Sequence, residues 1–122
     1  MTYVDGFVVP VPKKNIDAYR RMSRKAGKIW IEHGALDYKE CVGDDLDIEG
    51  VLSFMKGTKV KPGETVVFAF ITYKSRAHRD RVNRKVMADP RMDSPPEDMP
   101  FDPRRMMYGG FMAIVDLVAE PE

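Results

Sequence analysis

Two titratable residues of this 122-residue chain stand where a side chain could move a proton. His33 ends a stretch with helical spacing, on the same face as Ile29 and Trp30. Histidine exchanges a proton near neutral pH, so His33 could act as a general base or a ligand donor at the mouth of a pocket. The structural alternative is a helix C-terminal cap or a satisfied core residue, because a protonated histidine is favoured at that end of a helix.

Asp5 is the second candidate for catalysis. It is a carboxylate in an apolar strand, and the two-residue period of a strand places it on the same side as Tyr3 and Phe7. If it is buried, it must be neutral or paired with a cation such as Arg105. A pocket role and a structural role, at an edge or in an ion pair, both stay open. The candidate ligand-pocket residues are Tyr3, Phe7, Trp30, Arg105, Met107 and Tyr108.

The segment 89–111 contains five of the nine prolines and can be neither the interior of a helix nor that of a sheet. Within it, Arg104 and Arg105 precede Met106–Tyr108 and could orient an anionic ligand against a soft apolar wall. Alternatively, the methionines fill a dimer core while the arginines pair with Asp102. The segment is therefore either a lid over a ligand or a dimer contact.

Other kinds of chemistry find no support in the residue spacing. The two histidines and Cys41 do not have the spacing of a metal site. The chain has no phosphate-binding glycine loop and no Rossmann fingerprint, so the sequence predicts neither a metal nor another cofactor. A net charge of +1, with no aromatic residues interleaved among the basic ones, argues against nucleic-acid binding.

The composition is that of one globular domain over residues 1–122, with 43% hydrophobic and 32% charged residues. No apolar run approaches the ~20 residues of a membrane span, and the N-terminus does not have the pattern of a signal peptide. A single cysteine fits a reducing compartment, so we expect a cytoplasmic protein without membrane contact.

The hydrophobic periodicity predicts alternating strands and helices. Strands are expected at 2–11, 36–42, 65–73 and 110–118, a short one at 51–55, and helices at 16–33 and 75–88. Asn15 and Ser75 are the expected N-caps of the two helices. This order is typical of the ferredoxin-like split βαβ fold, an α+β fold with both helices on one face of an antiparallel sheet.

The strongest predicted strand does not alternate between apolar and polar residues, since Val66–Ile71 is apolar throughout. A half-exposed antiparallel sheet should alternate, so both of its faces must be covered. Two helices can cover only one face. We therefore expect a homodimer whose sheets pack face to face, as in a dimeric α/β barrel.

Several segments of the chain together resemble one family of small bacterial proteins, domain of unknown function 1428. They are Tyr3–Pro12, Glu32–Leu36, Glu40–Asp45, Glu64–Phe68, Lys85–Met92, Met99–Asp102 and Arg105–Phe111. The resemblance implies a dimeric α/β-barrel fold and supplies no catalytic residues. Pro103 and Arg104 depart from the Gly-Lys pair usual in the family.

Fold analogy favours the binding or cofactor-free turnover of a small molecule in a cavity between the sheet and the helices. The alternatives are a structural or regulatory dimer without chemistry and, with less support, an anion or nucleic-acid binder that uses the basic helices.

Overall fold

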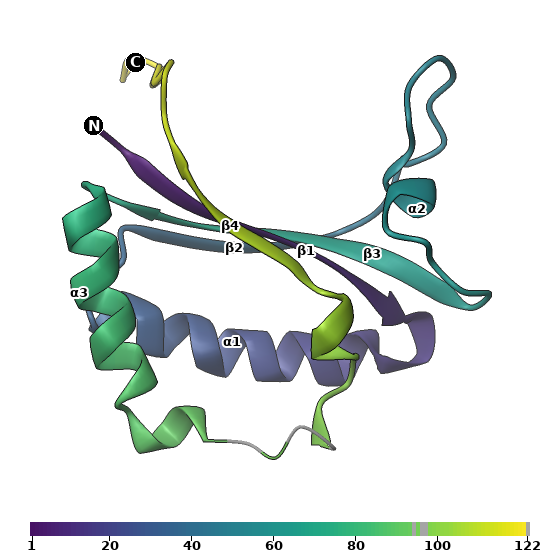
Figure 1. Cartoon of the computed structure of the whole chain (residues 1–122), viewed down its shortest axis with the longest axis horizontal. Helices are drawn as coiled ribbons and strands as arrows, with labels where there is room; N and C mark the ends of the chain where they lie inside the picture. The colour runs from purple at the N-terminus through teal and green to yellow at the C-terminus, as the bar shows by residue number, and fades with distance from the viewer. Residues whose placement is uncertain (94, 96–97, 122) are drawn as a thin grey trace.

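The computed structural model describes residues 1–93, 95 and 98–121 of the chain, which fold around a four-stranded antiparallel sheet with the strand order β2-β3-β1-β4. The strands are β1 (Tyr3–Pro12), β2 (Asp37–Val42), β3 (Glu64–Tyr73) and β4 (Met107–Met112). The helices are α1 (Ile16–Glu32), α2 (Phe54–Gly57) and α3 (Arg76–Met87), with 3-10 turns η1 (Lys13–Asn15), η2 (Pro90–Met92) and η4 (Pro103–Arg105). Both long helices lie on one side of the sheet, which confirms the predicted ferredoxin-like α+β fold (Figure 1).

Local sequence signals set most of the element boundaries. The side chain of Ser75 accepts a hydrogen bond from the backbone N–H of His78 and so caps α3, as predicted. Gly34 follows the end of α1 with a φ of 114°, a conformation that residues with a side chain rarely adopt.

Three local predictions are wrong. Residues 51–55 contain no strand, because Ser53 caps the single turn of α2 by accepting from the backbone N–H of Lys56. The last strand is Met107–Met112 rather than 110–118, because β4 pairs only with β1, and β1 begins at Tyr3, opposite Met112. The side chain of Asn15 does not cap α1; its amide donates instead to the carbonyl oxygen of Pro100 at 2.9 Å.

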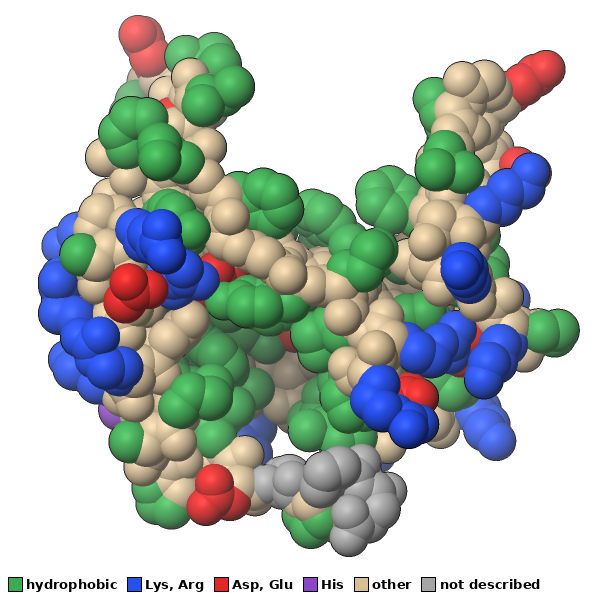
Figure 2. All heavy atoms as spheres, viewed as in Figure 1, with side chains coloured by type: hydrophobic (Ala, Val, Ile, Leu, Met, Phe, Trp, Pro, Cys, Tyr) green, Lys and Arg blue, Asp and Glu red, His purple; other side chains and the backbone are tan. Residues whose placement is uncertain are grey.

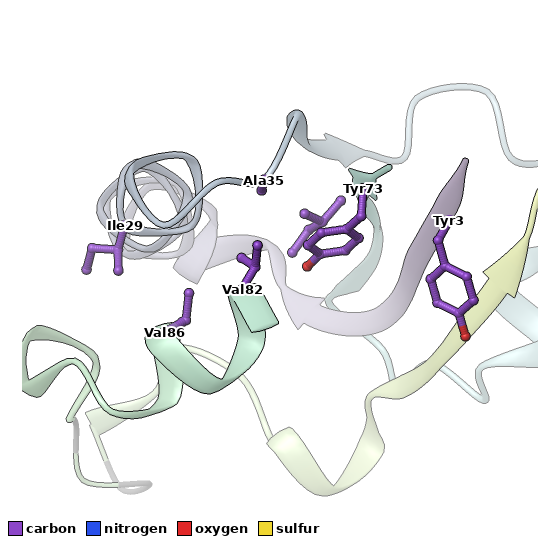
Figure 3. Packing of buried hydrophobic residues seen from close by; sticks show 7 residues of the cluster. Tyr3, Ile29, Ala35, Tyr73, Val82 and Val86 are labelled. Carbon is purple, nitrogen blue, oxygen red and sulfur yellow. The ribbon is translucent and has the colours of Figure 1, made fainter. Parts of the chain in front are cut away.

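The core beneath the sheet consists of two clusters of buried residues. The first joins α1 and α3 to the ends of β1 and β3 and contains Tyr3, Ile29, Ala35, Ile71, Tyr73, Val82 and Val86 (Figure 3). The second lies under the other end of β1 and contains Val9, Val11, Tyr19 and Val67. Alternate residues of β1 and β3 supply both clusters, so the remaining residues of these strands point to the opposite face of the sheet.

That opposite face carries no helix comparable to α1 or α3 among the described residues, and we call it the open face. Two arms rise beside it at opposite ends, the segment that contains α2 and the C-terminal segment after β4 (Figure 1). Hydrophobic side chains gather on the floor between the arms (Figure 2). Exposed large hydrophobic residues of the open face and the arms include Phe68, Met107, Phe111, Val51, Leu52, Phe54, Ile114, Val115, Leu117 and Val118.

The close contact between α1 and β2 yields a test of the helix packing. A Cβ atom at Gly27 would lie 2.6 Å from the ring of Tyr38. We expect Gly27→Ala to lower the free energy of unfolding, since overpacking costs about 1–3 kcal/mol and outweighs the gain of about 1 kcal/mol in helix propensity. Urea denaturation measures the difference.

Gly57, at the end of α2, provides the matched control, because a Cβ atom there would meet nothing within 4 Å. Gly57→Ala should leave the stability unchanged or raise it. A Gly27→Ala variant as stable as wild type would contradict the packing of α1 against Tyr38.

Candidate functional site

A cavity of about 280 Å³ lies beneath the sheet, between α1, the helix-covered face of the sheet and the crossover, the segment that joins α3 to β4 (residues 88–106). Residues of both core clusters line this cavity, so the cavity lies between the two clusters. The walls are largely aromatic and thioether side chains, including Phe7, Trp30, Phe101, Met22, Met92, Met99 and Met106. Methionine side chains are flexible and polarisable, so such walls can adapt to different apolar shapes.

One end of the cavity is polar. The hydroxyl of Tyr19 donates to Glu40 Oε1 at 2.7 Å, and the hydroxyl of Tyr38 donates to Glu40 Oε2 at 2.6 Å. Ser23, one helical turn after Tyr19, also lines the cavity and is only 4% exposed. Its Oγ has no hydrogen-bond partner among the described residues, although buried polar groups usually have one.

Both tyrosines at this end remain protonated at any physiological pH. Burial raises the pKa of Tyr19 and of Tyr38 well above the usual range, and the charge of Glu40 raises it further. Each hydroxyl therefore keeps the proton that it donates to Glu40.

Side chains hold the crossover against the rest of the domain at several points. His33, the C-cap residue of α1, has its Nε2 2.9 Å from Asp89 Oδ2. Arg91 Nη2 bridges Asp89 and Glu32 at 2.8 and 2.7 Å. The hydrogen bonds that Asp89 accepts from Arg91, and then from His33, lower its pKa well below the usual range.

The far end of the crossover is held by aromatic packing and a bidentate ion pair. The ring of Phe101 packs edge-on against Tyr19, with 5.5 Å between the ring centroids. Arg105 donates to both carboxylate oxygens of Glu64, at 2.7 and 2.9 Å, and this contact lowers the pKa of Glu64. The crossover is thus a fixed wall of the cavity at these contacts.

Asp5 belongs to a second polar cluster, between β1 and α3. Its carboxylate is 1% exposed and accepts from Arg79 Nη1 at 2.8 Å and from Asn83 Nδ2 at 3.4 Å. Arg79 also donates to the hydroxyl of Tyr108 at 2.9 Å and lies over the ring of Tyr3. Both oxygens of Asp5 therefore have partners within the protein. The predicted pairing of Asp5 with Arg105 is wrong, because Arg105 lies beside Glu64.

The structure divides the sequence-predicted site residues among several places. Phe7 and Trp30 line the cavity, whereas Asp5 and His33 do not. Tyr3 and Tyr108 contact Arg79 in the Asp5 cluster, although Tyr108 also stacks on Phe7, with centroids 4.8 Å apart. Met107 pairs with Val8 and points to the open face.

Sequence reasoning missed the polar end of the cavity. Tyr19 and Ser23 are four residues apart on the buried face of α1, and Tyr38 and Glu40 are two residues apart on one face of β2. These spacings place each pair on one side of its element, a buried side for Tyr19 and Ser23 and a half-buried side for Tyr38 and Glu40, and that is the signal that the sequence offers. Only the packing of α1 on β2 brings the two pairs together.

The described ranges, 1–93, 95 and 98–121, contain no group of three or more histidine, cysteine or acidic residues that could hold a metal ion. Nor does any of their helices have the length and apolar character needed to cross a membrane.

A family model described as protein of unknown function, DUF1428, matches residues 2–103. The chain is 48% identical over 116 residues to the uncharacterized protein YbaA of Escherichia coli K12, and the alignment covers 95% of this chain and 99% of that protein. YbaA of Shigella flexneri matches to the same extent. A solved dimeric ferredoxin-like protein from an uncultured marine organism is similar with a TM-score of 0.54 at 12% identity, over 96% of this chain and 100% of the other.

The Asp5–Arg79 pair generates a stability prediction. Arg79→Met leaves the buried carboxylate without its cation, so we expect the free energy of unfolding to fall by about 3–5 kcal/mol. Adding Asp5→Asn to that variant should restore part of the loss. Arg104→Met is the control, because the Arg104 side chain is 89% exposed in its pair with Asp102. If Arg104→Met lowered the free energy of unfolding as much as Arg79→Met does, the stabilising role of the Asp5–Arg79 pair would be refuted.

The Asp89 contacts predict a pH dependence. A carboxyl group with a lowered folded-state pKa adds stability above its unfolded pKa of about 3.9, and this contribution is lost as the pH falls further. Asp89→Asn should therefore be less stable than wild type at pH 7, and the gap should narrow below about pH 4. Urea denaturation midpoints of both proteins, taken between pH 7 and pH 2.5, measure this difference in stability.

Ser53→Ala serves as the control for this series, because it removes the cap of α2 without changing a titratable group. Its stability difference from wild type should not vary with pH. A gap for Asp89→Asn that stays constant down to pH 2.5 would count against the ion pairs of the crossover.

Proposed function

Because the chain belongs to DUF1428, a family described as proteins of unknown function, we propose its role from the site itself: each protomer binds a small apolar molecule in the cavity beneath the sheet. The observation that carries this proposal is the cavity of about 280 Å³, with apolar walls and one polar end. An apolar cavity of about 150 Å³ can bind benzene, so this volume suits a molecule of about two rings.

The energetics of packing also favour a binding role. Unfilled volume in a protein core costs stability, at about 24 cal/mol per Å³ in mutational series. A cavity of this size, together with the unpartnered hydroxyl of Ser23, departs from ordinary core packing in two respects at one place. A ligand that fills the volume and bonds Ser23 would remove both costs.

A homodimer formed through the open face is the second part of the proposal. Exposed apolar patches of this extent mark interaction surfaces on proteins. The patch continues from the floor of the sheet onto both arms, and a second copy of the chain offers the same apolar surface in return (Figure 2). The ferredoxin-like structural neighbour is itself described as dimeric, which supports a dimer for this chain.

The two roles are compatible, because the cavity and the open face lie on opposite sides of the sheet. The single free cysteine fits a reducing compartment, so we expect the dimer to act in the cytoplasm.

The cavity can be tested through Trp30, the single tryptophan, whose indole N–H gives one resolved NMR signal. Titration with 2-ethylnaphthalene, an apolar two-ring molecule, should shift this signal in wild type. Ala26 lines the cavity, and Ala26→Leu would fill part of the volume that the ligand needs. We expect binding to weaken by about tenfold or more, because the ligand loses apolar burial comparable to that of a leucine side chain, about 1.5–3 kcal/mol.

Ala77→Leu, on the exposed side of α3, is the matched control and should bind as wild type does. The proposal fails if Ala26→Leu and wild type bind the molecule equally well.

The dimer can be tested by light scattering coupled to size exclusion. We expect wild type at twice the chain mass of 13.9 kDa, and Phe68→Lys as a monomer because it buries charge between the two sheets. Ile31→Lys on α1 is the control. Ile31 is as exposed as Phe68, at 46% and 44%, but the two residues lie on opposite sides of the sheet. A monomeric wild type, or equal dissociation of both variants, would rule out the open face as the interface.

A further inference from the structure

The polar end of the cavity has a defined set of hydrogen-bond donors and acceptors. Both oxygens of Glu40 accept a hydroxyl proton, one from Tyr19 and one from Tyr38, so the carboxyl group acts as an acceptor at both oxygens. Tyr19 and Tyr38 have committed their only hydroxyl protons to Glu40, so their oxygens can only accept a further bond. These three side chains therefore present acceptors alone, and a ligand that meets them must supply a donor.

Ser23 can supply the hydrogen-bond donor that the other three side chains lack. Its hydroxyl can both donate and accept. It makes no well-formed hydrogen bond among residues 1–93, 95 and 98–121, although it lies near enough to the Tyr19 hydroxyl to offset part of the rise that burial causes in the pKa of that group. A ligand group that donates to one acceptor of the Glu40 cluster and accepts from Ser23 would use both kinds of hydrogen-bonding capacity at this end. A hydroxyl group does both, whereas a methyl group does neither.

Charges of both signs border this end of the cavity. The groove that shares Ser23, Tyr38 and Glu40 with the cavity also carries the basic residues Arg20, Arg24 and Lys28. The apolar lining rather than the charge therefore disfavours an ionic head group. That lining is predominant in the cavity and would desolvate any charge without compensation.

We infer that the natural ligand is a neutral molecule with an apolar body of about two rings and a hydroxyl group at one end, received by Ser23 and Glu40. This inference rests on the proposed binding function and specifies its ligand class. Ser23 is then a specificity-determining residue that binding requires and folding does not.

Four probes that share a naphthalene body and differ only in the head group test the inference. They are 2-naphthalenemethanol, 2-ethylnaphthalene, the cation of 2-naphthylmethylamine and 2-naphthoate. We expect wild type to bind the alcohol about three- to tenfold more tightly than the ethyl compound, as measured by NMR titration, which is the effect of one net hydrogen bond. Both ions should bind more weakly than the alcohol.

Ser23→Ala should bring the affinity ratio of the alcohol to the ethyl compound close to one. Its thermal midpoint should be unchanged or raised, because the lost hydroxyl makes no well-formed hydrogen bond in the part of the chain that the structure describes. Ser53→Ala, on the far side of the sheet, is the matched control and should keep the wild-type ratio. Glu40→Gln should also lower the ratio, since it removes an acceptor while keeping the shape of the side chain.

The outcomes separate the inference from the function on which it rests. Equal binding of the alcohol and the ethyl compound overturns the hydroxyl assignment and leaves the binding function standing. Preference for the naphthoate or the amine also overturns it. A Ser23→Ala variant that keeps the preference for the alcohol overturns the role of Ser23. Binding of none of the four probes overturns the binding function and the inference together.

Discussion

The antiparallel pairing of β1 with β3, which runs without interruption from Tyr3 opposite Tyr73 to Pro12 opposite Glu64, determines the two surfaces of the protein. Because side chains alternate along a strand, this register sends Val9 and Val67 toward the helices and sends Val8 and Phe68 to the open face. A slip of one residue would exchange the two sets. The helix-side core, the cavity and the open face all depend on this pairing.

The cavity follows from how the helices cover that sheet. α3 packs over one end of β1 and β3, and Tyr19 of α1 packs over the other, so the two buried clusters leave a volume between them. The crossover closes this volume with Met92, Met99, Phe101 and Met106. Ion pairs hold the described residues at its two ends, His33 with Asp89 and Glu64 with Arg105, against the rest of the domain.

Two polar clusters lie beneath the sheet, and their hydrogen bonding distinguishes them. Around Asp5, the carboxylate is matched by Arg79 and Asn83, and Asn83 also accepts from the indole of Trp30 and the hydroxyl of Tyr73. That cluster is complete and ties α3 to the sheet. Around Glu40, acceptors and the hydroxyl of Ser23 face a cavity, so that cluster has capacity left for a ligand. A buried carboxylate such as Asp5 therefore does not by itself identify a binding site. An unsatisfied polar group beside a carboxylate, such as Ser23 near Glu40, does indicate one.

The sequence by itself determined the ferredoxin-like order of elements, both main helices, the central strands and the family, because periodicity, caps and motifs are local properties. It also indicated that the second face of the sheet needs a cover. Only the tertiary structure decided which distant side chains meet: Arg79 rather than Arg105 for Asp5, Asp89 for His33, and Ser23 with Glu40 at one cavity. It also ended the last strand at Met112, where β1 no longer offers a partner. Such contacts depend on how helices pack across a sheet, and the spacing of residues along one segment contains no information about that packing.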